Sequence, residues 1–133
     1  TRRCGWQLRL LADASRDLDL DRQLTLGADV GLRGWSPDFF DGTGRALANV
    51  QWRALIKDDV FHVLALGFEV FADAGATWDP RVGRGTDGAR FDAGFGIIGD
   101  LTTIGVVNIA RIELGFPDDG SGPTVIVSTS ALF

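Results

Sequence analysis

The stretch FHVLALGFEVFADAG, residues 61–75, alternates large apolar side chains with small or charged ones along most of its length. One side of an extended chain would carry the apolar set Leu64, Leu66, Phe68, Val70 and Ala72. The other side would carry Ala65, Gly67, Glu69, Phe71 and Asp73. Because successive side chains of a β-strand point to opposite faces, this period of two predicts one long strand.

The same alternation recurs before and after this stretch, whereas helical periodicity is almost absent. The further segments that alternate are 6–14, 46–57, 90–99, 105–116 and 124–133. Turn-forming sequences separate them, among them the pair Asp58-Asp59 and the run PDDGSG at 117–122. The sequence therefore predicts an all-β protein with about six antiparallel strands, joined one after the next in an up-and-down order.

The two faces of these predicted strands differ in polarity. In 46–57, for example, Val50 and Trp52 alternate with Asn49, Gln51 and Arg53. A soluble β-sandwich packs its apolar faces inward and turns its charges toward water. A transmembrane barrel reverses this arrangement, because its outer face meets lipid and its lumen is wet. Segments of this length also match the roughly 9–11 residues with which a tilted strand crosses a bilayer. The pattern favours a transmembrane barrel, and a soluble β-barrel that binds a small ligand is the alternative.

Composition argues against several classes of function. The 133 residues carry a formal net charge of -5, so no basic surface is expected to bind nucleic acid. Cys4 and His62 are the single cysteine and histidine, which leaves no disulfide framework and no zinc-ligand spacing. Neither a Ser-His-Asp set nor a pair of carboxylates suited to acid–base work stands out. We therefore expect no catalytic residues, no metal, no cofactor and no enzymatic activity.

The run GFGIIG, residues 94–99, matches the dinucleotide-binding pattern GxGxxG by letter alone. That motif requires a helix after the last glycine, whose N-terminus would face a pyrophosphate. The residues that follow are rich in β-branched side chains and alternate in polarity. We interpret the glycines as leaving room on the inner face of a barrel.

One arginine stands in a glycine-rich run, LGADVGLRGW, residues 26–35, whose glycine density excludes a helix. A guanidinium enclosed by a barrel needs a carboxylate partner, since an unpaired buried charge is costly. Glu69 and Asp73 both lie on the predicted inner face. Asp73 is near the strand end from which the loop would also emerge. The sequence thus predicts that a salt bridge between Arg33 and Asp73 clamps the loop inside the barrel.

Several segments resemble motifs of the outer-membrane assembly and two-partner-secretion barrel superfamily, which includes BamA, TamA and FhaC-type transporters and bacterial surface antigens. The loop tetrad that resembles the (V/L)RG(F/Y) motif is Leu32, Arg33, Gly34 and Trp35. The residues that resemble its F-x-D-x-G strand motif are Phe71, Asp73 and Gly75. The segments GFGIIGDL and NIARIELGFP resemble its penultimate hairpin, and the final Phe133 resembles its C-terminal signal. The match covers roughly residues 18–133 in the family's order.

The resemblance implies that residues 1–133 are the C-terminal part of one sixteen-stranded outer-membrane barrel and supply its last six strands. It implies a loop at 15–45 folded into the lumen and held there by the arginine and the acid at Asp73. The implied activity is insertion or translocation of proteins across the bacterial outer membrane, without a cofactor. The implied partners are outer-membrane lipid, client or passenger proteins, and periplasmic domains upstream in the same chain. Some relatives instead carry a patatin-like lipase before the barrel.

The sequence departs from the family's pattern in three places. Gln51 stands where members often carry glutamate, so a second acidic partner for the loop arginine would have to come from elsewhere, and Glu69 is the candidate. Trp35 replaces the usual Phe or Tyr and keeps an aromatic ring. Ala131 stands where the terminal signal would have a second aromatic residue.

Overall fold

The computed structural model describes residues 4–15, 24–60, 64–78, 85–100 and 109–130. Its elements are all strands: β1 (Cys4–Ala14), β2 (Leu24–Leu26), β3 (Phe40–Gly42), β4 (Gly44–Val60), β5 (Leu64–Trp78), β6 (Arg90–Asp100), β7 (Ile109–Pro117) and β8 (Thr124–Ser130). No helix that is long and apolar enough to cross a membrane occurs in this described part of the chain.

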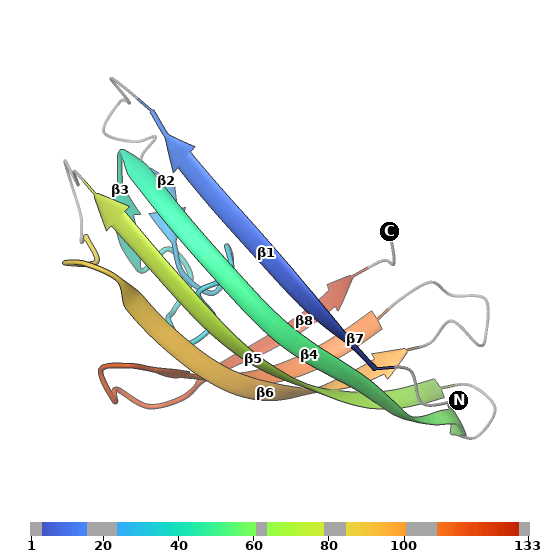
Figure 1. Ribbon diagram of the computed structural model, residues 1–133. Helices are drawn as coiled ribbons and strands as arrows, with labels where there is room; N and C mark the ends of the chain where they lie inside the picture. The colour runs from blue at the N-terminus through green and yellow to red at the C-terminus, as the bar shows by residue number, and fades with distance from the viewer. Residues whose placement is uncertain (1–3, 16–23, 61–63, 79–84, 101–108, 131–133) are drawn as a thin grey trace.

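Six of the strands form one antiparallel sheet in the order β1-β4-β5-β6-β7-β8. Apart from the small β2–β3 hairpin, which forms a sheet of its own, each strand pairs with the next along the chain. The predicted all-β, antiparallel, up-and-down arrangement is therefore confirmed. The sheet is open, with β1 and β8 at its edges, and it curves around the β2–β3 segment (Figure 1).

Three boundaries differ from those that the sequence predicts. Asp58 and Asp59 do not form a turn, because β4 continues to Val60, which pairs with Leu64. β5 extends past Gly75 to Trp78, since Gly44 pairs with Trp78 and continues the ladder. The predicted loop at 15–45 ends earlier and contains the β2–β3 hairpin. Local turn signals were overridden here by backbone pairing with the neighbouring strand.

The two faces of the curved sheet have opposite polarity. The convex face presents large apolar side chains to the outside, including Trp6, Leu8, Leu10, Val70, Phe95, Ile97, Ile112, Val125 and Val127. The concave face buries charged and amide side chains, including Asn49, Gln51, Glu69, Asp73, Asp92 and Glu113. The alternation in the sequence thus separates an apolar outer face from a polar inner one.

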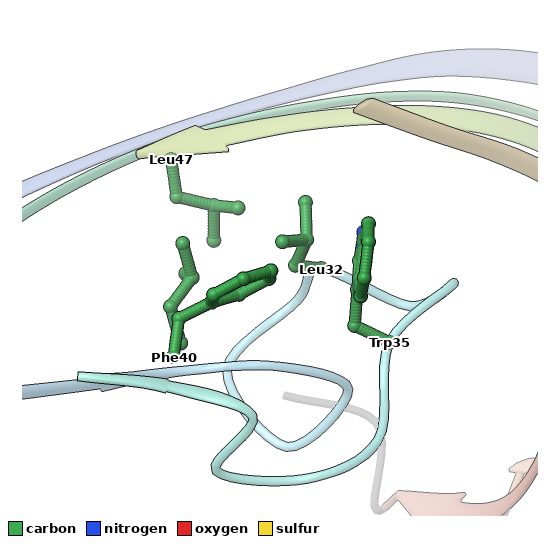
Figure 2. Close-up of a cluster of buried hydrophobic side chains, with 5 residues drawn as sticks. Leu32, Trp35, Phe40 and Leu47 are labelled. Carbon is green, nitrogen blue, oxygen red and sulfur yellow. The ribbon is translucent and has the colours of Figure 1, made fainter. Parts of the chain in front are cut away.

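The segment between β2 and β4 packs against the concave face through an apolar cluster. Leu26, Leu32, Trp35 and Phe40 from this segment bury their side chains together with Leu47 of β4. Figure 2 shows Leu32, Trp35 and Phe40 converging beneath Leu47. The Trp35 and Phe40 rings meet edge to face with centroids 4.9 Å apart, a favoured arrangement for aromatic pairs. We call residues 24–42, which include β2 and β3, the inner loop.

Candidate functional site

A tight turn in the inner loop presents Arg33 to the sheet. The Gly27 carbonyl accepts hydrogen bonds from the N–H groups of Val30, Gly31 and Leu32 at 3.1, 3.0 and 2.9 Å. Gly31 has φ +134°, a backbone conformation that side chains rarely allow. The turn therefore needs glycine at this position, and it directs Leu32 and Arg33 toward the concave face.

Arg33 and Asp73 form a two-pronged salt bridge, as the sequence predicts. Arg33 donates from Nε to Asp73 Oδ2 and from Nη2 to Asp73 Oδ1, each at 2.7 Å. Both residues are buried, at 8% and 3% exposure. Parallel hydrogen bonds between a guanidinium and a carboxylate fix orientation as well as distance. We call this Arg33–Asp73 ion pair the clamp, because it joins the inner loop to β5.

Two further acceptors and one ring complete the surroundings of the guanidinium. Nη1 of Arg33 donates to Gln51 Oε1 of β4 at 3.0 Å and to Glu113 Oε1 of β7 at 2.8 Å. The Arg33 Cζ atom lies 3.6 Å from the centroid of the Phe71 ring, a cation–π contact. The inner loop is therefore joined through a single side chain to three strands of the sheet.

The charge of Arg33 is stabilised by these partners. Burial lowers the pKa of the guanidinium, but the hydrogen bonds and negative charges of Asp73 and Glu113 outweigh burial and raise the pKa above its ordinary value. An arginine side chain keeps its proton in proteins, and these partners favour the charged form further. The clamp is an ion pair, and it cannot be released by loss of the arginine proton.

The three F-x-D-x-G residues have three different contacts on one face of β5. Phe71 lies under the guanidinium, and Asp73 binds it. A Cβ atom added at Gly75 would lie 2.7 Å from Leu26 Cδ2, so the missing side chain makes room for the inner loop. The spacing of two places all three residues toward the loop.

Asn49 reinforces the clamp and was not predicted as a site residue. Its Nδ2 donates to Asp73 Oδ1 at 2.7 Å and to the Gly31 carbonyl at 2.6 Å. Asn49 and Asp73 are direct partners in the β4–β5 ladder. The alternation in 46–57 assigns Asn49 to the inner face, but only the register shows that it lies opposite Asp73.

Glu69 is not the second partner of Arg33, contrary to the sequence-based prediction. It accepts a hydrogen bond from Arg53 Nε at 3.0 Å, and these two residues are direct partners in the β4–β5 ladder. Glu113 makes the second contact instead. The physical reason is register, since Arg53 lies directly opposite Glu69 and donates to it. The alternation places Glu113 on the inner face, but no local signal relates it to Arg33.

The glycines of GFGIIG lie on a strand, and no helix follows them in the described part of the chain. A Cβ atom at Gly96 would lie 2.9 Å from Glu113 Cγ, and one at Gly94 would collide with the Phe71 ring and the Leu114 backbone. Gly94 and Gly96 therefore leave room on the inner face for the side chains around the clamp, as the sequence predicts. Gly99 lies on the outer face instead, where it pairs with Leu66.

Further contacts fasten the inner loop at its margins. Arg45 of β4 donates to the Thr25 carbonyl at 2.7 Å and pairs with Asp13 of β1 at 2.8 Å. Thr124 of β8 donates through Oγ1 to the Gly34 carbonyl at 2.8 Å. The loop is thus joined to both halves of the sheet. Phe133, the predicted C-terminal signal, lies outside the described residues.

The concave face also carries a partly open cavity of about 420 Å³ beside the clamp, with a lining of mixed polarity. Its lining includes Arg9, Arg53 and Ser128, together with residues 28–31 of the inner loop. Among the described residues, no group of three or more His, Cys, Asp or Glu side chains could hold a metal ion. The chemistry visible here is that of ion pairs and hydrogen bonds that hold a loop in place.

No protein-family model matches this chain, and no curated protein and no solved structure is similar to it at a significant level. What the clamp does must therefore be inferred from the geometry of the loop and the sheet.

Proposed function

We propose that this chain belongs to a bacterial outer-membrane β-barrel that inserts or translocates other proteins, and that Arg33 and Asp73 hold the inner loop in its lumen. One observation carries the proposal. A loop closes over a buried polar face of the sheet, while the opposite face turns large apolar side chains outward. That combination suits a wall between lipid and a wet lumen.

The convex face supports a lipid environment because its outward positions are almost all apolar and carry no charged side chain. Its outward positions in 6–12, 46–56, 66–78, 91–99, 110–116 and 125–129 alternate along the chain, and none of them carries a charge. Trp6 and Val127 are 75% and 72% exposed. A continuous apolar surface of this extent would be a liability in water, whereas lipid would cover it.

The alternative function, a soluble β-barrel that binds a small ligand, requires the opposite facing. Apolar side chains would line its interior, and charged ones would meet water. Asp73 and Glu113 are instead 3% and 4% exposed, whereas Ile112, next to Glu113, is 57% exposed. The observed burial therefore favours the membrane proposal over the soluble one.

Ile112→Arg tests the proposal directly, because Ile112 lies at the middle of β7 on the convex face. If this face meets lipid, the variant should destabilise the folded protein by about 2–4 kcal/mol, the cost of arginine near the bilayer midplane. If the face meets water, the change should be within about 0.5 kcal/mol, as at ordinary surface sites. The measurement is urea unfolding of the full-length protein in lipid vesicles, followed by heat-modifiable gel migration.

Ser121→Arg in the exposed hairpin between β7 and β8 is the matched control, since it adds the same charge outside the strands. It should leave the unfolding midpoint unchanged. The membrane proposal fails if Ile112→Arg behaves like this control, or if the wild-type protein shows no heat-modifiable band and stays in the soluble fraction.

A further inference from the structure

The Arg33 guanidinium links two strands that are not neighbours in the sheet. Asp73 is on β5 and Glu113 is on β7, and β6 separates these two strands in the sheet. Backbone hydrogen bonds cannot join β5 to β7 directly. The Arg33 guanidinium does so through the side chains, at 2.7 Å from Asp73 and 2.8 Å from Glu113.

The residue of β6 beneath this contact is a glycine. A Cβ atom at Gly96 would lie 2.9 Å from Glu113 Cγ, so the Glu113 side chain lies over the space that Gly96 leaves empty. Gly96 and Glu113 are also direct partners in the β6–β7 ladder. This arrangement allows the carboxylate to turn back over β6 toward the inner loop.

Two different acceptors share the same Arg33 nitrogen. Gln51 Oε1 lies 3.0 Å from Nη1 and is neutral, whereas Glu113 Oε1 lies 2.8 Å from it and belongs to a side chain that can carry a charge. A charge-assisted hydrogen bond is roughly twice as strong as a neutral one. Glu113 is 4% exposed, so its attraction to Arg33 is weakly screened.

The loop backbone also lies directly against β7 near this contact. A Cβ atom at Gly115 would lie 2.6 Å from the Arg33 carbonyl oxygen and 2.7 Å from the Gly34 nitrogen. The loop therefore touches β7 through its backbone as well as through the Arg33 side chain. Movement of β7 away from β5 would disturb both contacts.

We propose that Glu113 is a second positioning residue for the inner loop, which acts through its negative charge on Arg33 and makes loop seating depend on β7. The inference deepens the proposed function. It rests on that function in one respect, namely that the inner loop takes part in transport. It adds to Asp73 a second carboxylate, which neither the two motifs nor the sequence pattern identified.

Tryptic cleavage of the Arg33–Gly34 bond provides a readout of loop seating. Trypsin can cut there only when the loop leaves the sheet, because Arg33 is buried and its guanidinium is occupied. Under fast opening and closing, the cleavage rate reports the population of the open form. The experiment uses full-length folded protein in detergent and measures the fragment that begins at Gly34 by mass spectrometry.

Glu113→Gln keeps the shape and one acceptor oxygen but removes the charge, so we expect cleavage after Arg33 to become about tenfold faster. Asp118→Asn is the matched control, since it also removes one carboxylate, directly after β7, from a residue that pairs with Arg90 at 3.7 Å. It should change the rate by less than about twofold, because it removes no contact of Arg33. Equal rates for Glu113→Gln and wild type, or equal acceleration by both variants, would overturn the proposal.

A rescue variant separates charge from packing. Gln51→Glu in the Glu113→Gln background places a carboxylate beside the same Nη1 atom from β4, and it should return the cleavage rate to within about threefold of wild type. If Glu113 acted only by packing β7, this second change would not rescue seating, and the proposal would be wrong. Should Glu113→Gln alone fail to fold, the double variant decides in the same way, by folding with slow cleavage or not.

This assay does not depend on transport. A wild-type protein that moves or inserts no client but shows the expected cleavage pattern would sink the proposed function and leave the role of Glu113 intact. A wild-type protein that transports its client but does not show the expected cleavage pattern would contradict only the role of Glu113.

Discussion

Asp73→Ala is expected to release the inner loop and to abolish most of the activity of the full-length protein. The substitution removes the two 2.7 Å hydrogen bonds from the Arg33 guanidinium to Asp73, and it leaves the buried charge with Glu113 and the neutral Gln51 as acceptors. Loss of one partner of a buried ion pair costs about 3–5 kcal/mol. Asn49 would also lose its acceptor on Asp73, which adds to the effect.

The measurement for Asp73→Ala has two parts. The first reads the proposed function, as the level of inserted or exported client proteins in cells that carry the variant in place of wild type. The second is a double-mutant cycle with Arg33→Ala, read by urea unfolding of the folded band. We expect a coupling energy of at least about 1.5 kcal/mol, as for close buried charge pairs.

Asp13→Ala is the control for this experiment. Asp13 also binds an arginine, Arg45, at 2.8 Å, but its side chain is 38% exposed. Partly exposed pairs contribute about 1 kcal/mol or less, so this variant should retain activity. If Asp73→Ala and Arg33→Ala each keep wild-type activity and their effects simply add, the clamp has no functional role.

Gly34→Ala is expected to prevent the inner loop from seating, although it adds only one methyl group. A Cβ atom at this position would lie 2.5 Å from Asp92 Cβ and 2.9 Å from the Pro117 nitrogen. Neither atom is at the end of a flexible side chain, so the loop itself must withdraw from β6 and β7. Overpacking of this kind costs about 1–3 kcal/mol, and withdrawal would also stretch the Arg33 contacts next to it.

The expected result for Gly34→Ala is loss of activity with faster tryptic cleavage after Arg33, while the heat-modifiable band remains. Gly115→Ala approaches the same contact from β7, because its Cβ atom would lie 2.6 Å from the Arg33 carbonyl, and it should give the same result. Gly5→Ala is the matched control, since no atom lies within 4 Å of its added Cβ. A Gly34→Ala protein that resists trypsin as wild type does would show that the loop tolerates the methyl group.

The Arg33–Asp73 salt bridge could be predicted from the sequence alone. The paired motifs indicated Arg33 and Asp73, and the argument that a buried guanidinium needs a carboxylate gave the same pair. The structure places these two residues in direct contact, with Phe71 and Gly75 beside them. Prediction succeeded here because spacing along one strand assigns residues to a common face.

The choice between Glu69 and Glu113 shows where that reasoning stops. Both residues alternate onto the inner face, so the sequence cannot rank them as partners of Arg33. The register places Arg53 opposite Glu69, and the curvature of the sheet brings Glu113 over Gly96 to the loop. Register and curvature depend on the pairing of whole strands, which a local pattern does not encode.

The sequence by itself determined the strand class, the order of the strands, the polarity of the two faces and the pairing of one arginine with one aspartate. These features depend on a period of two and on the cost of a buried charge, which both act locally. Only the tertiary structure decided the second carboxylate, the bridging role of Asn49 and the glycines that the loop requires. Each of these depends on distances between strands that are far apart in the chain, and those distances are set when the sheet curves around its own loop.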